Sequence, residues 1–548
     1  MGVSGITSVK KKSWIIVTLF FGLVIFLLLF HLDQFPSLWW DEGWTLSVAR
    51  NWVEHGIFGH YLDGAVIPPR IPVRFTEVIP IALSFKLFGV GVWQGRLPSV
   101  IFTLLTLVFL YYLASKLYNY QVANGTLFVG LCMSVYVYNP VFYGRQALGE
   151  MPMLFYLLGG YTFLWLALTR SFHWIWLAGL FWGISLLSKL QVPPFWLASI
   201  TLMLFVVFVR KEWRKGKIIL SGVISTLLIA FLLMEIQNRV IPSILEDQPL
   251  VVLLFNSVIF VFAWPVRLLA IENGLIYGLP AVLGFIFEGR KIISLLLASK
   301  IRPGTSKDSP NFSVTGELSS KSDTKATREI VQFGYWGLGV SWFAWYLFLG
   351  MCWPRYLFPA YFIGTLFLSA FLQSATHNFD WRATIQNASL ILLRKQINKI
   401  NLQALLAVLL IGVFISLSLI LLYQPIAETK TNPIAVTDYI ANKIPSNALI
   451  ETFESELFFL APHLYHFPSD FISMQLVRKV VIDPTLRIDY DPLQANPDYL
   501  IVGGYNNTWG LYDSVIASGA FKLEKELPGY QIYRRVRDYK EGALQDYP

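Results

Sequence analysis

The sequence predicts a mostly helical membrane protein that crosses the bilayer many times and ends in a small soluble α/β domain. Hydrophobic residues make up 55% of the 548 residues and charged residues only 14%, whereas a soluble domain carries about a quarter charged residues. Apolar runs of about 20 residues, the length that a helix needs to cross a bilayer, recur as far as residue 423. Beyond that point the composition becomes polar.

About eleven apolar segments qualify as membrane-spanning helices on length and composition. The predicted spans are 13–32, 95–115, 121–138, 151–169, 174–190, 193–209, 217–236, 272–288, 331–350, 355–373 and 404–423. Together they make residues 1–423 the predicted transmembrane domain.

Lysine and arginine in the short loops predict the orientation of these spans, because such residues favour the cytoplasmic side. Residues 10–12 are three lysines, and basic loops at 210–217, 289–291 and 392–399 fall on the same side if there are eleven spans. The segment 250–270 is also apolar, and we interpret it as an interfacial or re-entrant piece on the outer face.

The segments between and after the spans then divide between the two faces. Residues 289–330, which contain a polar stretch rich in serine and threonine, are predicted to form a cytoplasmic linker. The first outer loop, 33–94, and the C-terminal region, 424–548, are predicted to lie outside. The outer loop should form helices at the membrane interface.

The C-terminal region alternates between strand-like and helix-like runs, which predicts a small α/β domain. The strand-like runs are "ALIETF" (448–453), "DYLIVGG" (498–504) and "YQIYRRV" (530–536), and the helix-like runs are "AVTDYIANKI" (435–444) and "SELFFLAPHLY" (455–465).

Charge and cysteine content exclude some function classes. The net charge of +9 is spread over short loops between spans, so it does not indicate nucleic-acid binding. The two cysteines, Cys132 and Cys352, lie in or beside apolar segments and predict neither a disulfide framework nor a zinc site.

Ionisable residues next to the spans gather at the predicted outer ends of helices. They are Arg96, Glu150, Lys189, Glu235, Glu272 and Arg355. Charges so close to hydrocarbon are costly and often functional, although any single one can be a snorkelling or paired helix end. The combined set of acids and cations is suited to a lipid-linked anionic group, since arginine binds phosphate oxygens in pairs.

The stretch "SLWWDEGWTLSVARNW" (37–52) places Asp41 and Glu42 directly after the first span. Helix capping explains one acid at a helix start, but less readily two beside tryptophans. An aromatic face with a spacing of four residues predicts a helix that lies flat on the outer membrane surface. That face consists of Trp40, Trp44, Val48 and Trp52.

Six motifs in order resemble GT-C glycosyltransferases, in particular the protein O-mannosyltransferase and aminoarabinose transferase group. They are "WWDEGWTLSVARNWVEHG" (39–56), "RFTEVIP" (74–80), "GRLPSVIFTLLTL" (95–107), "YGRQALGEMPMLFY" (143–156), "GLFWGISLLSKLQVPPF" (179–195) and "PRYLFPAYF" (354–362). Val78 stands where the family often has a lysine. The resemblance covers most of 13–372, whereas the C-terminal domain is similar only in kind.

The resemblance implies a GT-C fold and a sugar donor linked to polyprenyl phosphate, either undecaprenyl or dolichyl. It further implies inverting transfer to an acceptor hydroxyl of a protein, lipid or glycan on the non-cytoplasmic face. Such a protein would be an integral, multi-pass component of a bacterial or archaeal cell membrane, with its active site and C-terminal domain outside.

The candidate site residues follow from the positions of these motifs. Asp41 is the candidate general base, with exchange of roles with Glu42 as the main alternative. Glu42, Glu77 and Glu150 are candidates for orienting the sugar or acceptor, or for holding a divalent cation. Candidates for binding the carrier phosphate are Arg145, Lys189, Arg355, Tyr143 and Tyr356. The acids lack a defined spacing with histidine, so metal use stays open.

Three other functions compete with single-sugar transfer. A GT-C enzyme that moves a whole lipid-linked glycan would share the architecture. A secondary transporter would place polar or broken helices near the bilayer midplane, which this sequence does not predict. An inactive scaffold is disfavoured because the Asp41–Glu42 pair and its cations are intact.

Overall fold

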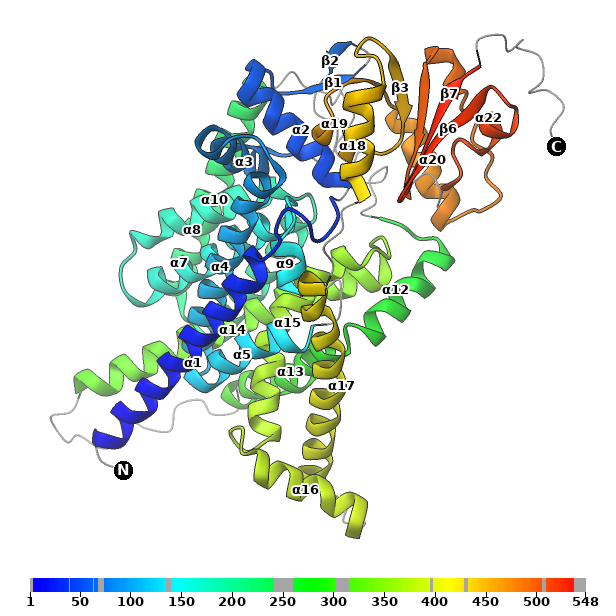
Figure 1. Ribbon diagram of the computed structural model, residues 1–548. Helices are drawn as coiled ribbons and strands as arrows, with labels where there is room; N and C mark the ends of the chain where they lie inside the picture. Colours follow the sequence, from blue (N-terminus) through cyan, green and yellow to red (C-terminus); the bar gives the residue numbers. More distant parts are fainter. Residues whose placement is uncertain are drawn as a thin grey trace.

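The computed structural model describes residues 3–38, 40–62, 64–67, 73–134, 139–240, 260–300, 315–394, 398–427, 432–504 and 509–536. It consists of a helical bundle with a small β-sheet at one end (Figure 1). We call this the sheet end of the bundle. Helix α1 begins at the opposite end and runs toward the sheet.

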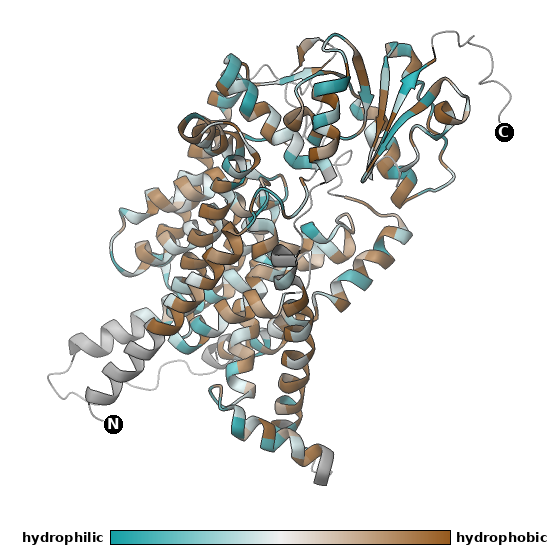
Figure 2. Cartoon of the chain, viewed as in Figure 1, coloured by the Kyte–Doolittle hydropathy of each residue, from teal (hydrophilic) through white to brown (hydrophobic). Residues whose placement is uncertain are grey.

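The bundle contains helices of different lengths, most of them apolar. They are α1 (Val3–Leu29), α4 (Val92–Leu117), α5 (Tyr120–Cys132), α6 (Pro140–Gly144), α7 (Glu150–Thr169), α8 (Trp174–Ser188), α9 (Val192–Arg210), α10 (Trp213–Val240), α12 (Trp264–Ile276), α13 (Leu279–Lys300), α14 (Thr315–Phe348), α15 (Pro354–Ala375), α16 (Trp381–Arg394) and α17 (Lys399–Ala427). Apolar residues cover most of the bundle, whereas the sheet end is mixed in hydropathy (Figure 2).

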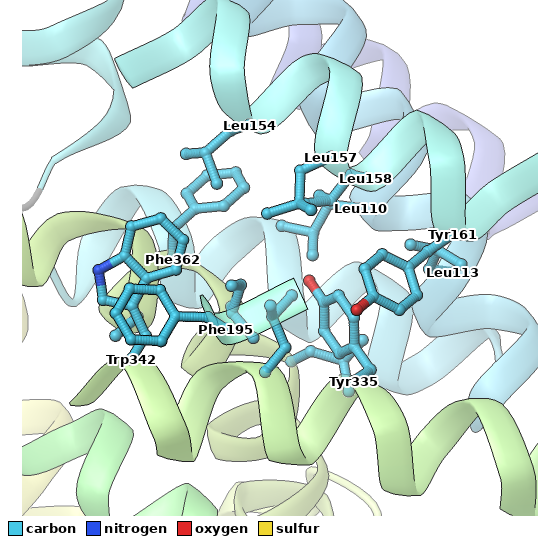
Figure 3. Close-up of a cluster of buried hydrophobic side chains, with 14 of the residues drawn as sticks. Leu110, Leu113, Leu154, Leu157, Leu158, Tyr161, Phe195, Tyr335, Trp342 and Phe362 are labelled. Carbon is cyan, nitrogen blue, oxygen red and sulfur yellow. The ribbon is translucent and has the colours of Figure 1, made fainter. Parts of the chain in front are cut away.

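The core of the bundle is formed by leucine and aromatic side chains of α4, α7, α9, α14 and α15 (Figure 3). Tyr161 of α7 makes an edge-on contact with Tyr335 of α14, with ring centroids 5.6 Å apart. Its hydroxyl donates a 2.5 Å hydrogen bond to Ser199 of α9. The buried Tyr161 hydroxyl thus finds a partner on a neighbouring helix, as is usual for polar groups in a low-dielectric interior.

Each of the eleven predicted apolar segments overlaps a helix of the structure. In the described part of the chain, six helices are long and apolar enough to cross a membrane, or seven if the bent pair α12–α13 is one span. The multi-spanning helical prediction is therefore confirmed, and the number eleven stays a prediction.

The predicted helix 272–288 is divided in two. Helices α12 and α13 meet at an angle of 74°, because Pro280 cannot donate a hydrogen bond to the preceding turn. Most of the predicted re-entrant segment 250–270 lies outside the described residues. Its last part forms the beginning of α12.

The predicted linker 289–330 is wrong in its extent. Helix α13 continues to Lys300 and α14 already begins at Thr315, so both ends of the predicted linker are helical. Residues 301–314 lie outside the described residues.

Two helices and a hairpin follow α1 in the predicted outer loop. They are α2 (Trp40–His55), the antiparallel strands β1 (His60–Leu62) and β2 (Ala65–Ile67), and α3 (Phe75–Phe88). These elements lie at the sheet end, where α2 and the hairpin stand beside the C-terminal sheet (Figure 1).

The C-terminal region forms a five-stranded mixed sheet with helices, as the sequence predicts. Its strand order is β4-β3-β5-β7-β6, with β3 parallel to β4 and β5, and β7 antiparallel to β5 and β6. The elements are α18 (Asn432–Lys443), β3 (Leu449–Thr452), α19 (Glu456–Leu460), β4 (Leu464–His466), α20 (Asp470–Val481), β5 (Tyr499–Val502), α22 (Asp513–Ala517), β6 (Phe521–Leu527) and β7 (Tyr530–Arg535). The predicted boundary at 423 falls inside α17.

The sheet shares one hydrophobic core with α2 and α3. Trp44 and Val48 of α2 and Val78 of α3 are buried in the same cluster as Val436 of α18 and Ile450 of β3. The first loop and the C-terminal region therefore fold as one unit at the sheet end.

Candidate active site

An ion pair joins Asp41, in the first turn of α2, to Arg355, in the first turn of α15. Both helix starts agree with local sequence preferences, since acids favour a helix N-terminus and Pro354 favours the first helical position. The Asp41 side chain is 9% exposed and that of Arg355 is 19% exposed. This pair is thus desolvated but still reachable.

Arg355 also lies against two aromatic rings. Its guanidinium carbon is 5.2 Å from the ring centroid of Trp353 and 5.3 Å from that of Tyr356. In the described part of the chain, its one hydrogen bond runs from Nη1 to Asp41. Nε and Nη2 therefore remain for a further anion.

A second polar group forms around Lys189, which follows α8 in an extended conformation. Its ammonium donates to Oε1 of Glu150, the first residue of α7. Gly149 allows this approach, because a Cβ there would lie 2.1 Å from Oε1 of Glu77 and 2.9 Å from Cε of Lys189. Glu77, Glu150 and Lys189 therefore converge on one glycine.

Burial raises the pKa of Glu77 to about 8. The charge of Lys189 opposes the rise, that of Glu150 adds to it, and that of Arg74 opposes it. A carboxyl group with this pKa is largely protonated at neutral pH and can donate a hydrogen bond. Glu77 can thus act as a hydrogen-bond donor beside Lys189.

Tyr356 directly follows Arg355, the partner of Asp41, and its ring lies against the Arg355 guanidinium. Six of the nine predicted site residues thus fall into two polar groups. The first consists of Asp41, Arg355 and Tyr356, and the second of Glu77, Glu150 and Lys189.

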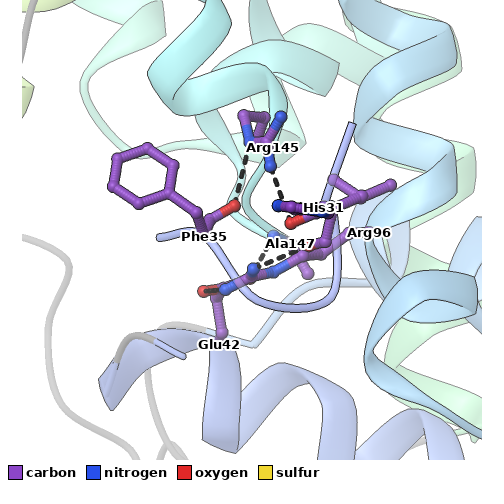
Figure 4. Close-up of polar contacts among 7 residues, drawn as sticks. His31, Phe35, Glu42, Arg96, Arg145 and Ala147 are labelled. Carbon is purple, nitrogen blue, oxygen red and sulfur yellow. Dashed lines mark hydrogen bonds and ion pairs between the residues drawn. The ribbon is translucent and has the colours of Figure 1, made fainter. Parts of the chain in front are cut away.

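Glu42 points to a different partner from its neighbour Asp41. Arg96 of α4 donates to both carboxylate oxygens, at 2.9 and 2.8 Å, and the backbone N–H of Ala147 donates to Oε1 at 2.7 Å (Figure 4). Both side chains of this pair are fully buried. These contacts favour a role in holding α2 on the bundle, a partnership that sequence reasoning missed.

Arg145 binds backbone carbonyls at the end of α1. Its guanidinium donates to the carbonyl oxygens of Phe35 and His31 (Figure 4). It also donates to those of Leu27 and Phe30. Those bonds use four of its five N–H donors. The carrier-phosphate role predicted for Arg145 therefore has no support from its contacts.

Tyr143, another predicted carrier-phosphate residue, is buried beside Phe358 of α15, with ring centroids 4.4 Å apart. Its ring thus fills the interior of the bundle. The predicted role of its hydroxyl stays a prediction.

Two of the four residues in the aromatic face of α2 are buried inside the protein, so the face as a whole is not open to a membrane surface. Trp44 and Val48 are buried, and Trp44 packs edge-on against Phe458 and Phe467 of the C-terminal region, with ring centroids 5.0 and 4.8 Å apart. A periodic apolar face predicts burial but does not distinguish lipid from a protein partner.

The residues that the structure describes include no group of three or more His, Cys, Asp or Glu side chains placed to hold a metal ion. In the candidate site, the ammonium of Lys189 lies against Glu150. The positive charge next to the Glu150 carboxylate is thus that of Lys189. We derive no step through a metal.

Comparisons with known proteins agree with this geometry. Residues 79–234 match the family described as dolichyl-phosphate-mannose-protein mannosyltransferase. No curated protein sequence matches the chain. The matched range contains Arg96, Glu150 and Lys189 but neither Asp41 nor Arg355.

Solved structures similar to this chain include ArnT from Cupriavidus metallidurans bound to undecaprenyl phosphate, with 14% identity, a TM-score of 0.57, and coverage of 95% of this chain and 98% of that one. The apo state of the same protein gives a TM-score of 0.54 at 14% identity, covering 96% and 98%. The Archaeoglobus fulgidus oligosaccharyltransferase tethered with an acceptor peptide gives 0.52 at 10% identity, covering 96% and 74%. The predicted resemblance to GT-C proteins is thereby confirmed, and the fold is theirs.

Proposed function

We propose that this protein transfers a sugar from a polyprenyl-phosphate donor to an acceptor hydroxyl. The observation that carries the proposal is the ion pair between Asp41 and Arg355, together with the Lys189 group. The proposal is supported by one carboxylate paired with a cation and by two further acids around a second cation. A similar fold binds undecaprenyl phosphate in the structure of ArnT, and the matched family is named for a dolichyl-phosphate-linked sugar.

In the proposed reaction, the acceptor oxygen attacks the anomeric carbon while the bond from that carbon to the phosphate oxygen breaks. The acceptor proton passes to Asp41, which acts as general base. The polyprenyl phosphate leaves with the bonding electron pair, and attack from the opposite face inverts the anomeric centre. Since phosphate is already a good leaving group, cations rather than a strong acid assist its departure.

Arg355 would contact two anions in turn. Its ion pair favours the ionised form of Asp41 and so lowers its basicity. An arriving phosphate would attract the free Nε and Nη2 donors of the same guanidinium. As Arg355 turns toward the phosphate, its contact with Asp41 would loosen and leave the Asp41 carboxylate open to the acceptor hydroxyl.

The Lys189 group would serve the sugar end of the donor and its phosphate. Lys189 supplies a second positive charge for the leaving phosphate. Glu77 in its protonated form can donate a hydrogen bond to a sugar or acceptor oxygen, whereas Glu150 can only accept one while it is ionised. Tyr356 adds a further hydroxyl.

The proposed reaction occurs on the non-cytoplasmic face, so the sheet end of the bundle would lie outside. The basic loops support this orientation. Cysteine labelling from outside the cell tests it. A probe at position 441, an exposed residue of α18, should react and one at position 315 should not, and the reverse result would contradict the proposed face.

Transfer of a whole lipid-linked glycan is the second candidate, because the fold is also similar to that of an oligosaccharyltransferase. The mass of the transferred group distinguishes the two reactions. A single-sugar transferase adds one residue per acceptor site, whereas an oligosaccharyltransferase adds a complete glycan.

The direct test is mass spectrometry of lipid-linked sugars in cells that lack the protein. A polyprenyl phosphate bearing a single sugar should accumulate, and purified protein should convert it to free polyprenyl phosphate when acceptor is added. An unchanged lipid-linked pool together with no conversion in vitro would contradict the proposal.

A further inference from the structure

The C-terminal region contacts the first turn of α2 through residues 453–456, which we call the docking turn. The indole N–H of Trp40 donates a 2.8 Å hydrogen bond to the carbonyl oxygen of Phe453. In return, the Ser455 hydroxyl donates a 2.6 Å hydrogen bond to the carbonyl oxygen of Trp40. Asp41 directly follows the residue that is held in both directions.

Gly43 is the point of closest approach between α2 and the docking turn. A Cβ at Gly43 would lie 2.4 Å from the carbonyl oxygen of Ser455 and 2.5 Å from Cα of Glu456. Both are backbone atoms, so the clash has no flexible side chain that could move aside. The backbone of Gly43 is not in the left-handed region, and glycine is therefore required here for proximity rather than for conformation.

Residues farther along α2 also contact the C-terminal region. Arg50 donates a 3.1 Å hydrogen bond to the carbonyl oxygen of Phe459, and Trp44 packs against Phe458. On its other side, α2 is held by the buried pair of Glu42 and Arg96. The residue between Trp40 and Glu42 is thus fixed from the bundle and from the C-terminal region.

We propose that the docking turn is a positioning element for Asp41, so that the C-terminal region belongs to the catalytic architecture. The inference rests on the proposed role of Asp41 as base. Ser455 and Trp40 act through the backbone of the first helical turn and need not touch either substrate. Loss of the Ser455 hydrogen bond should slow transfer and leave the affinity for the donor unchanged. The residues proposed to bind the donor phosphate, Arg355 and Lys189, belong to other elements.

The test compares Ser455→Ala with Ser455→Thr, which restores the hydroxyl, and with Ser473→Ala as a matched control. Ser473 lies in the same C-terminal region, is partly exposed, and also donates to a backbone carbonyl. The readouts are the single-turnover rate with the lipid-linked sugar that accumulates in cells lacking the protein, and the affinity for undecaprenyl phosphate.

Ser455→Ala should lower the transfer rate about fivefold, the effect of one neutral hydrogen bond, with affinity for undecaprenyl phosphate within twofold of wild type. Ser455→Thr should recover most of the rate, and Ser473→Ala should match wild type. Gly43→Ala should lower the rate more than Ser455→Ala, since it displaces backbone. A Ser455→Ala rate within twofold of wild type, or a parallel loss of rate and affinity, would overturn the inference.

Trp40→Phe provides a second route if Ser455→Ala does not fold, because it removes the N–H donor and keeps an aromatic ring. Loss of folded protein in both variants would also overturn the inference, since the contact would then be a requirement for folding. Asp41→Asn in the same assay separates this outcome from failure of the proposed function. If Asp41→Asn transfers sugar normally, the base assignment fails. If Asp41→Asn is inactive and Ser455→Ala is normal, only the positioning role fails.

Discussion

Two ion pairs start from neighbouring residues of α2 and differ in almost every physical respect. Glu42 accepts two hydrogen bonds from Arg96 and one from the backbone of Ala147, and no part of either charged side chain reaches solvent. Asp41 meets Arg355 through a single guanidinium nitrogen, and both side chains remain partly exposed. The first pair is saturated by the protein, whereas the second keeps donors for a ligand.

The difference shows that two neighbouring acids at a helix start can have separate roles, one structural and one open to a ligand. A buried bidentate pair fixes the position of a helix, because breaking it leaves an uncompensated charge in the interior. A partly exposed pair can exchange partners at lower cost. We therefore expect substitutions at Glu42 to act on folding and substitutions at Asp41 to act on transfer.

The largest effect on stability should come from Arg96→Ala, which removes the cation and leaves the Glu42 carboxylate buried. Breaking such a pair costs about 3–5 kcal/mol, enough to unfold a marginally stable protein. Thermal unfolding in detergent measures the change. Glu54→Gln breaks an exposed ion pair on the same helix and should cost about 0–1 kcal/mol. Equal losses in the two variants would contradict the comparison.

A smaller effect, on ligand affinity, should follow from Arg355→Ala and Lys189→Ala. A charged hydrogen bond is worth about 1.5–3 kcal/mol, so each variant should bind undecaprenyl phosphate roughly tenfold to a hundredfold more weakly. Arg534→Ala, an exposed residue of the sheet, serves as the control and should bind normally. Unchanged affinity in both site variants would refute the phosphate assignment.

A third buried carboxylate, Glu456, sharpens the comparison because in the described residues no lysine or arginine is paired with it. Its Oε1 accepts a 2.7 Å hydrogen bond from Tyr530, and its Oε2 has no hydrogen-bond partner. Burial, together with the charge of Glu454, raises the pKa of Glu456 to about 8. The folded protein thus binds a proton more tightly at this group than the unfolded chain, whose glutamates titrate near pH 4.3.

Stability should therefore fall as pH rises between about 4.5 and 8, because the unfolded chain ionises first. Glu456→Gln should flatten this dependence and raise the melting temperature at pH 8. Glu526→Gln, at an exposed position of β6, should leave the dependence as in wild type. Melting temperatures of the purified variants from pH 5 to 8.5 measure it, and parallel curves for wild type and Glu456→Gln would contradict the assignment.

Much of the bundle follows from the sequence alone, since apolar runs of sufficient length must satisfy their backbone groups as helices in a membrane. Helix α16, Trp381–Arg394, was not predicted because it is short and mixed in composition. The bend between α12 and α13 depends on one proline in an otherwise apolar run. The strands β3, β5 and β7 were predicted from their β-branched and aromatic residues.

The candidate site was predictable where charge was unusual for its place in the chain. Asp41, Lys189 and Arg355 are charged residues beside apolar segments. In the structure Asp41 pairs with Arg355, and Lys189 pairs with Glu150. The partners of Glu42 and Trp44 were not predictable, because they come from segments far apart in the sequence. Gly43 carried a usable signal, since a glycine inside a helix lowers its stability and calls for a close neighbour.

Single-turnover transfer by Asp41→Asn tests the division between the two acids most directly. Asparagine keeps the size of the side chain and can still cap a helix, so the variant should fold and bind undecaprenyl phosphate. It cannot accept a proton, and loss of a general base lowers a rate by a factor of about 10²–10⁴. The account predicts a folded, donor-binding protein with transfer reduced by that factor. A transfer rate close to wild type in Asp41→Asn would contradict it.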